Sequence, residues 1–514
     1  MPSVSPRRAE PPLILSIDVG TTSVRAMLFD RMARDVRGTA ASADTPLATT
    51  PDGGATLDAE RLLELTLDVI DRTLDAASRE MGVRTQVDGV AISTFWHSFL
   101  GVDAQNRPTT PLLVWADSRA SAEMLELRSR LDERAVHART GCLLHWSYWP
   151  AKLLWLRNSM PDAYARTARW VSFGEFLHLR LLDRAVCGVS MASGTGLLDQ
   201  NAQQWDAEML ATLKLDADRL LPLTGQGEAV GRPRPEYARR WPAIRDAWWF
   251  PSVGDGAVSN VGSGCVTRDR MALMVGTSAA LRVAWRGERT EIPWGAWCYR
   301  IDENRFVLGC ADSNGGNLFQ WLGETLRLPA ARETERVLRS MTADAHGLTV
   351  LPFIAGERGP GYAAHARAAA LGLSQSTRPI EVLRAGLEAV ALRFALMYGI
   401  ITSVLPPPKQ AVATGGGLQK SPAWAQIIAD ALGRPLVASG EREASSRGAA
   451  LLALERLGAV ENVETTPAAF RGTYQPDDEA HARLLAAQER HRHYYQRLVT
   501  EEQPLEASGG KQWG

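Results

Sequence analysis

The stretch LILSIDVGTTSVRAMLF at residues 13–29 carries the first strong structural signal in this chain. Residues 13–18 form an apolar run that ends on Asp18, residues 19–23 have the composition of a turn, and residues 24–29 are apolar again. Two short apolar runs joined by a Gly-containing turn predict a β-hairpin. Residues 87–93 predict a further short strand.

A related stretch occurs 256 positions later. Residues 271–275 are apolar, Gly276-Thr277-Ser278 forms a turn, and residues 279–285 are apolar again. Both copies contain Val-Gly-Thr followed by Ser, and the first has Asp18 where the second has Met274. So short a string also recurs by chance, but its place between two apolar runs favours duplication of one domain.

Helix signals alternate with these strands. Asp58 is placed to cap a helix whose apolar residues lie on one face and which Gly82 ends. A second helix is expected around 379–400, before a strand at 410–413, and a third follows Ser421-Pro422 and stops at Gly433. An amphipathic helix at about 477–499 closes the fold. This alternation predicts an α/β layered architecture.

Composition excludes several functions. A chain of 514 residues is too long for one hydrophobic core, so two or more domains are expected. Lys and Arg number 57 against 58 Asp and Glu, which leaves no basic field for nucleic acid or anionic lipid. Five cysteines without a C-x-x-C pair indicate buried thiols in a reducing compartment. No uncharged apolar stretch of about 18 residues occurs, so we expect no membrane span and a cytoplasmic protein.

The two turns are candidates for phosphate binding, since the sequence has neither a P-loop nor G-x-G-x-x-G after a strand. Backbone N–H groups at a Gly turn, with Thr and Ser hydroxyls, can cradle phosphate oxygens. The candidate residues are Gly20, Thr21, Thr22 and Ser23 in the first turn and Gly276, Thr277 and Ser278 in the second. Asp18 is then placed to hold Mg²⁺. The alternative is a plain hairpin whose hydroxyls satisfy their own turn.

Two glycine-rich sites follow. Gly415, Gly416 and Gly417 precede a capped helix and suit an adenine ring or a phosphate, although a flexible loop explains them equally well. Asp255 lies between Gly254 and Gly256, and these glycines would let a substrate approach an aspartate kept ionised at a helix start. Such an aspartate can accept the hydroxyl proton in phosphoryl transfer to an alcohol. The alternative is a helix-capping aspartate.

In their order along the chain these motifs resemble the FGGY family of carbohydrate kinases, from about residue 13 to 460. Residues 115–119, Trp-Ala-Asp-Ser-Arg, look like the family's sugar-side segment, and Gly356-Glu357-Arg358 with Pro360 is similar to a second-domain block. The resemblance implies an α/β protein of two actin-like (ribonuclease H-like) ATPase domains facing across a cleft. We expect an N-terminal, sugar-side domain at 11–264 and a C-terminal, nucleotide-side domain at 265–500, with mobile ends at 1–10 and 507–514.

The resemblance also implies roles for residues. Asp255 matches the catalytic base, Asp18 the magnesium-side carboxylate, the two turns the phosphate segments, and Gly415 to Gly417 the adenosine segment, with ATP and Mg²⁺ as cofactors. The substrate-side residues implied or inferred are His97, Trp115, Asp117, Arg119, Lys152 and Asp255. The expected partner is a small-molecule sugar or sugar acid, with a homodimer left open and neither nucleic acid nor a membrane involved.

The substrate prediction rests on finer similarities. Residues 94–98, 141–152 and 443–448 look most like members assigned as gluconate kinases, so we expect D-gluconate to be converted to 6-phosphogluconate. A buried carboxylate needs a cation nearby, and Arg119 and Lys152 are the candidates. Arg119 pairing with Asp117, and Lys152 lying at the surface, is the alternative. Xylulose or another ketopentose remains a second substrate hypothesis, and a non-catalytic actin-like sugar sensor a distant one.

Overall fold

The computed structural model describes residues 3–82, 85–225, 227–415 and 417–501. Its N-terminal half is built on a sheet in the order β14-β6-β1-β2-β3, with β15 also paired to β6. The strands are β1 (Ile14–Val19), β2 (Ser23–Phe29), β3 (Ala41–Asp44), β6 (Gly89–Thr94), β14 (Trp248–Trp249) and β15 (Val253–Gly254). β1 is antiparallel to β2 and parallel to β6, so the predicted hairpin is confirmed.

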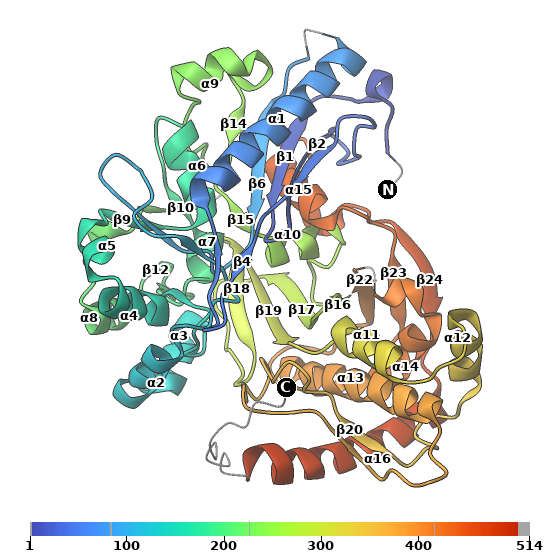
Figure 1. Ribbon diagram of the computed structural model, residues 1–514. Helices are drawn as coiled ribbons and strands as arrows, with labels where there is room; N and C mark the ends of the chain where they lie inside the picture. The colour runs from blue at the N-terminus through green and yellow to red at the C-terminus, as the bar shows by residue number, and fades with distance from the viewer. Residues whose placement is uncertain (1–2, 83–84, 226, 416, 502–514) are drawn as a thin grey trace.

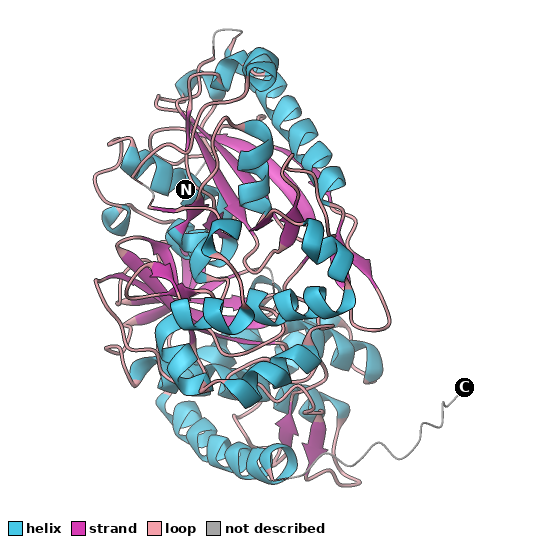
Figure 2. Cartoon of the chain, turned by 90° about the vertical axis from the view of Figure 1, so that its left-hand side faces the viewer, coloured by secondary structure: helices cyan, strands magenta, loops and turns pink. Residues whose placement is uncertain are grey.

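A second sheet repeats this arrangement in the C-terminal half, in the order β18-β19-β17-β16-β22-β23-β24. Its strands are β16 (Arg270–Val275), β17 (Ala279–Arg286), β18 (Trp297–Asp302), β19 (Arg305–Asp312), β22 (Gln410–Thr414), β23 (Leu436–Ser439) and β24 (Phe470–Tyr474). β16 is antiparallel to β17 and parallel to β22, as β1 is to β2 and β6. The shared pairing supports duplication. Figure 2 shows the two sheets one above the other along the long axis.

Helices cover both sheets, and their ends follow the predicted signals. α1 (Ala59–Met81) packs on β2 and β3; the Asp58 carboxylate accepts a hydrogen bond from Arg61 N–H, and Gly82 ends the helix. α14 (Pro422–Leu432) starts with Ser421 Oγ accepting from Trp424 N–H and stops at the left-handed Gly433. Four further helices of this half are α11 (Gly316–Thr325), α12 (Ala331–Ser340), α13 (Pro379–Thr402) and α16 (Asp478–Tyr495). A small sheet of β20 (Thr349–Leu351) and β21 (Ala369–Leu371) packs on α13 and α16.

Residues between β6 and β14 form a helical region on one side of the first sheet (Figure 1, left). Its helices are α2 (Ser121–Arg130), α3 (Glu133–Thr140), α4 (Trp149–Ser159), α5 (Pro161–Arg166), α6 (Phe173–Leu181), α7 (Val189–Ser193), α8 (Ala207–Leu213) and α9 (Pro235–Arg240). Short strands lie among them: β7 (Leu100–Val102), β8 (Leu112–Leu113), β9 (Arg169–Val171), β10 (Cys187–Gly188), β11 (Leu198–Asp199), β12 (Gln204–Trp205) and β13 (Leu223–Thr224). β4 (Ala48–Thr49) and β5 (Ala55–Leu57), which precede α1, form a small sheet with β8. A separate core around Trp149 and Trp170 stabilises this region.

One helix from the C-terminal half packs on the first sheet. α15 (Ala444–Arg456) contacts β1, β6 and α10 (Asp255–Gly262), as Figure 1 shows. α10 and α15 approach so closely that a Cβ at Gly262 would lie 1.8 Å from the carbonyl oxygen of Ala444. The two hydrophobic cores therefore do not separate at the expected domain boundary of 264/265, because side chains of residues 444–456 belong to the core of the N-terminal half.

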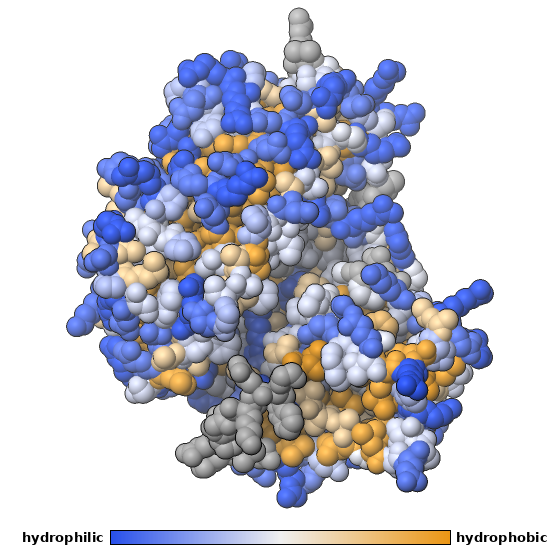
Figure 3. Space-filling model, viewed as in Figure 1, coloured by the Kyte–Doolittle hydropathy of each residue, from blue (hydrophilic) through white to orange (hydrophobic). Residues whose placement is uncertain are grey.

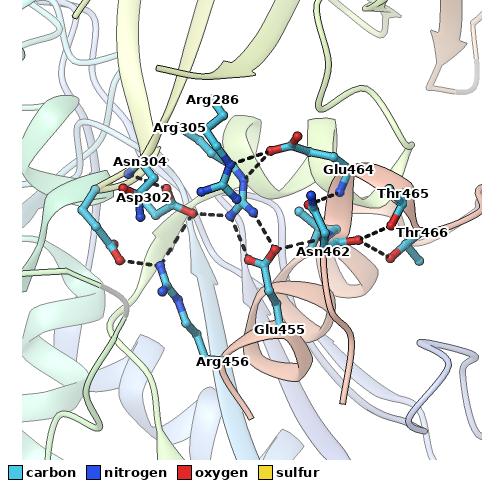
Figure 4. Close-up of polar contacts among 12 residues, drawn as sticks. Arg286, Asp302, Asn304, Arg305, Glu455, Arg456, Asn462, Glu464, Thr465 and Thr466 are labelled. Carbon is cyan, nitrogen blue, oxygen red and sulfur yellow. Dashed lines mark hydrogen bonds and ion pairs between the residues drawn. The ribbon is translucent and has the colours of Figure 1, made fainter. Parts of the chain in front are cut away.

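A buried ionic network fastens α15 to the second sheet (Figure 4). Arg305, at the start of β19, is 1% exposed and donates to Asp302 at 2.6 Å and to both carboxylate oxygens of Glu455 on α15, at 2.8 and 2.5 Å. Glu464 joins the same guanidinium at 3.4 Å and also binds Arg286. The β18–β19 turn and the end of α15 are thereby held together.

The N-terminal lead-in differs from the expectation of a mobile segment. Val4 is 5% exposed, exchanges backbone hydrogen bonds with Asp35 and Arg37, and is followed by a short 3₁₀ helix at Pro6–Arg8. An apolar side chain that packs beside β2 overrides the lack of periodicity in the segment. Residues 507–514 lie outside the described residues.

Two further expectations concern apolar residues. All five cysteines are buried and free, as predicted. α13 is long and apolar enough to span a membrane by length and composition, but 67% of its most apolar window is buried within the protein. It packs against α11, α14, β17 and β19 as a core helix of the second domain.

Candidate active site

The carboxyl ends of three parallel strands bring Asp18 and Asp255 to one edge of the first sheet. Asp18 on β1 is in register with Ser93 on β6, and Ser93 is in register with Val253 on β15. Asp255 follows β15 directly as the first residue of α10. Ligands of open α/β sheets bind at this edge. Gly254 occupies the capping position of α10, so Asp255 is not the helix cap that the alternative interpretation required.

Both aspartates keep part of their surface exposed, but protein surrounds the carboxylates closely enough to desolvate them. Burial raises the pKa of Asp255, while the Gly256 N–H group, which donates to Oδ1 at 2.7 Å, and the cation of Arg282 oppose the rise. Burial also raises the pKa of Asp18 to about 6, and the negative charge of Asp255 adds to this. The charge of Asp255 reaches Asp18, so the two side chains lie close enough to interact, and carboxylate oxygens are ligands that Mg²⁺ accepts.

A cavity of about 260 Å³ opens beside Asp255 between the two halves of the molecule, where the surface in Figure 3 is hollowed. From the N-terminal half it is lined by Phe95, Trp96, His97, Trp115, Asp255, Gly256 and Ser259. From the C-terminal half it is lined by Met274, Ser278, Ala279, Ala280, Arg282, Trp297, Tyr299, Ala311, Arg358 and Ser445. The structure thus brings together the predicted residues His97, Trp115, Asp255 and Ser278.

Trp96 explains the glycines around Asp255. A Cβ at Gly254 would lie 2.0 Å from the indole, one at Gly256 2.7 Å and one at Gly194 2.5 Å. The indole Nε1 donates to the Ser190 carbonyl at 3.0 Å, which fixes the ring in this slot. The expectation that these glycines leave room for a substrate is therefore wrong, because Trp96 fills that room and forms the cavity wall itself.

His97 lines the cavity in an unusual backbone conformation. Its φ is +66°, in the left-handed region that non-glycine residues seldom occupy. Its ring nitrogen Nδ1 lies 2.5 Å from the Gly194 carbonyl oxygen, and the imidazole ring packs edge-on against the ring of Tyr148. Burial, and next the charge of Arg358, lower the pKa of His97 well below its usual value, so the ring is neutral at pH 7.

Arg358 and Arg282 are cavity residues that the sequence analysis did not place in the site. The Arg358 guanidinium lies over the Trp115 ring at 5.4 Å. The preceding Glu357 is buried and binds Arg393, which also bonds to Asp312 at 2.8 Å, so Glu357 holds the loop while Arg358 points to the cavity. The Gly-Glu-Arg motif was a usable signal for Arg358. Arg282 lies within strand β17, and no sequence motif marked it as a site residue.

Asp117 and Arg119 do not line the cavity. The two side chains pair with each other, Nη2 to Oδ2 at 2.6 Å, and the guanidinium stacks over Trp155 at 4.3 Å. The Asp117 carboxylate also accepts from the Ala55 N–H group at 3.0 Å. This corrects the assignment of both residues to substrate contact, because the local ion pair satisfies their charges.

Lys152 is also absent from the cavity wall and, contrary to the alternative, from the surface. Its side chain on α4 has no exposure at all, and Nζ donates to the carbonyl oxygens of His97 at 3.0 Å and Val114 at 2.9 Å. Burial lowers its pKa to about 7. Lys152 therefore contacts the two segments that contain His97 and Trp115 on the side that faces away from the cavity.

Each turn is closed by a hydrogen bond from its glycine to its serine, but the first turn has four residues and the second three. Gly20 N–H donates to the Ser23 carbonyl at 2.8 Å, and Gly276 N–H to the Ser278 carbonyl at 2.9 Å. Thr22 and Thr277 are exposed at the tips, with Thr21 beside Thr22. The first turn of α11 packs on the second hairpin, since Gly316 N–H donates to the Gly276 carbonyl.

The glycine-rich loop after β22 packs against the second hairpin. Gly415 has φ +86°, and Gly417 N–H donates to the Val275 carbonyl at 3.2 Å, where a Cβ would lie 2.7 Å from that oxygen. Gly416 lies outside the described residues. Beside this loop, a cavity of about 390 Å³ is lined by residues of α11, α12, α13 and the turn at 418–420, among them Phe319, Leu326, Leu338, Leu383 and Lys420. It is mostly apolar.

Comparison with known proteins identifies the family. The model of the N-terminal domain of the FGGY family of carbohydrate kinases matches residues 13–262, and the model of its C-terminal domain matches residues 271–455. A gluconokinase from Bacillus subtilis (strain 168) is 24% identical over 476 residues, 90% of this chain and 91% of the relative. A xylulose kinase from Escherichia coli (strain K12) is 25% identical over 492 residues, 95% and 99% of the two chains.

Solved structures agree. A ligand-bound xylulose kinase and a gluconate kinase, both from Lactobacillus acidophilus, superpose with TM-scores of 0.89 at 25% identity, covering 95% of this chain and 99% and 98% of theirs. The predicted fold of two actin-like (ribonuclease H-like) domains is confirmed. With both family models matched in order along the chain, this protein belongs to the FGGY family of carbohydrate kinases.

Proposed function

We propose that this sugar kinase transfers the γ-phosphoryl group of ATP to the primary hydroxyl of D-gluconate, yielding 6-phosphogluconate. Asp255 accepts or orients the proton of that hydroxyl. Asp18 holds Mg²⁺, which when bound neutralises charge on the phosphates. Xylulose or another ketopentose is the second candidate, since a xylulose kinase matches as closely in structure as a gluconate kinase does.

The observation that carries the gluconate proposal is the charge of Arg358. Among the described residues its guanidinium has no ion-pair partner, although it lines the cavity that contains Asp255. Its cavity neighbours Trp115, Tyr299 and neutral His97 provide no negative charge. Asp255 lines the same cavity and the charge of Arg358 opposes the rise of its pKa, but no ion pair joins the two side chains among the described residues. A linear sugar acid with its hydroxyl near Asp255 can complement this cation with its carboxylate, and such a charge-assisted pair is strong when partly buried.

The nucleotide side of the proposal involves both turns and a cavity in the second domain. Thr21 and Thr22 of the first turn and Thr277 and Ser278 of the second would contact the phosphates, together with their backbone N–H groups. The apolar cavity beside Gly415 and Gly417 suits an adenine ring, because its walls are aliphatic and aromatic. Lys420 at its rim has no ion-pair partner among the described residues and is exposed.

An ATP-consumption assay with gluconate, xylulose, ribulose, fuculose, rhamnulose, erythritol and glycerol tests the proposal. We expect the highest kcat/KM with gluconate. Arg358→Met should raise KM for gluconate at least about tenfold, equivalent to about 1.4 kcal/mol, with a smaller effect on xylulose. Arg119→Met is the matched control, since its guanidinium is paired away from the cavity and selectivity should persist.

A higher kcat/KM for any ketose in the wild type would reject gluconate as the substrate and leave the kinase activity intact. If Arg358→Met instead raised KM for ATP and lowered kcat with every acceptor, the guanidinium would serve the transferred phosphoryl group. The carboxylate role would then be rejected.

A further inference from the structure

We infer that Lys152 is a positioning residue that joins the two segments presenting His97 and Trp115 and thereby sets the shape of the sugar side of the cavity. The inference rests on the proposed function only in taking this cavity as the sugar site. It replaces the expectation that Lys152 meets the substrate.

The two segments are paired by backbone hydrogen bonds only up to Phe99 and Leu113, which exchange N–H···O bonds at 3.0 and 2.9 Å. Beyond that pair, toward the cavity, no backbone hydrogen bond joins residues 95–98 to residues 114–117 in the described chain. Lys152 Nζ takes over there, with donated bonds to His97 O and Val114 O. One side chain thus holds the carbonyl of a cavity residue and that of the residue just before Trp115.

The conformation of His97 makes such a tether necessary. A non-glycine residue at φ +66° persists only where its surroundings hold it. Its ring is held by the Gly194 carbonyl, and its own carbonyl by Lys152. If Nζ is removed, the His97 carbonyl is left buried without this donor, and the peptide is free to relax into a commoner conformation that turns the imidazole away.

The tether works in either protonation state. A neutral amine has two N–H donors, and the two carbonyls require two. Asp117 is the charged group that favours the protonated form, and burial opposes it. Because the side chain is fully buried behind the segments, a direct contact with a substrate is excluded by the same geometry.

Arg219 offers a matched control. Its guanidinium also donates to two backbone carbonyls, Tyr164 O at 3.0 Å and Thr167 O at 2.6 Å, in the same helical region. Neither carbonyl belongs to a segment that lines the cavity. Arg219→Met therefore removes a comparable tether without touching the sugar side.

The experiment compares Lys152→Met, Lys152→Gln and Arg219→Met, using whichever acceptor the wild type phosphorylates best. We expect Lys152→Met to raise KM for that acceptor at least about tenfold while KM for ATP stays within twofold. Lys152→Gln has an amide that keeps two N–H donors on a shorter chain, so its KM for the acceptor should lie between those of the wild type and Lys152→Met. Arg219→Met should lower Tm but leave both KM values within twofold.

A folded Lys152→Met variant with unchanged acceptor KM overturns the inference. So does failure of both Lys152 variants to fold while Arg219→Met folds, because Lys152 would then serve the whole domain rather than the cavity. A wild type that phosphorylates a ketose but not gluconate rejects the proposed substrate and still allows this test. A wild type that phosphorylates no acceptor rejects the proposed function, and isothermal titration of the same acceptors then tests the tether through binding alone.

Discussion

Gly254 and the indole of Trp96 are in direct contact, so that a Cβ at position 254 would lie 2.0 Å from Cε2 of the ring. This contact places a large aromatic residue immediately beside the candidate catalytic residue Asp255. The position of Asp255 therefore depends on a glycine before it and on a tryptophan that is distant in sequence.

Gly254→Ala is expected to displace the Trp96 indole. Overpacking of this kind costs about 1–3 kcal/mol, and kcat should fall because Asp255 is the next residue. Urea unfolding and steady-state kinetics check both effects. Gly399→Ala is the control, since a Cβ there meets nothing within 4 Å. It should be neutral or slightly stabilising, as helical Gly→Ala changes usually are. Wild-type stability and turnover in Gly254→Ala would contradict the packing described here.

Asp255→Asn should lower kcat by at least about 10²-fold, the low end for a positioned proton acceptor. ADP binding, measured calorimetrically, should change little because the nucleotide is expected mostly on the other domain. Asp477→Asn is a suitable control, since that aspartate caps α16 by accepting from Ala480 N–H and lies far along the chain from the cavity. Near-wild-type turnover in Asp255→Asn would refute the assignment.

Lys152 predicts a pH dependence of stability. Its folded pKa of about 7 lies below its ordinary value of 10.5, so between these pH values the unfolded chain binds more protons and stability rises with pH. The free energy of unfolding of the wild type relative to Lys152→Met should increase by roughly 1 kcal/mol per pH unit from 7 to 9. Urea titrations at several pH values measure this difference. A flat or falling difference would show that the ammonium is not desolvated.

Arg305→Met should be strongly destabilising. Removing this guanidinium leaves Asp302, which is fully buried, and Glu455 without their shared cation, a loss of about 3–5 kcal/mol. Arg286→Met removes an exposed partner of Glu464 and should cost less than about 1 kcal/mol. Equal effects in denaturant unfolding would mean that the network in Figure 4 adds nothing beyond surface pairing.

The cavity has walls from both halves of the chain, so binding of both substrates should favour closure that excludes water. We expect slow ATP hydrolysis without acceptor, strongly raised with it, and a smaller radius of gyration with acceptor and a nucleotide analogue. Small-angle X-ray scattering provides the measurement. An unchanged radius with both ligands bound would argue against closure.

Local features of this protein could be read directly from the sequence. Both hairpins, the Asp58 and Ser421 caps and the stops at Gly82 and Gly433 depend on neighbouring residues, so short patterns were enough to predict them. The repeat of one turn predicted two related sheets for the same reason. Asp18 was identified because it ends the first predicted strand, and Asp255 because glycines flank it at a predicted helix start. Only the structure showed that both lie at the carboxyl ends of parallel strands.

Only the tertiary structure decided which charged groups face the cavity. Arg119 and Lys152 occur in segments that resemble sugar-side sequence, and Arg358 occurs in one that resembles a second-domain block. Arg119 pairs with a carboxylate two residues away and Lys152 is buried beside two carbonyls, whereas Arg358 lines the cavity without an ion-pair partner among the described residues. The return of α15 to the first sheet, likewise, depends on close glycine contacts between distant segments. A side chain's partners across a fold follow from packing geometry, which residue type and spacing do not contain.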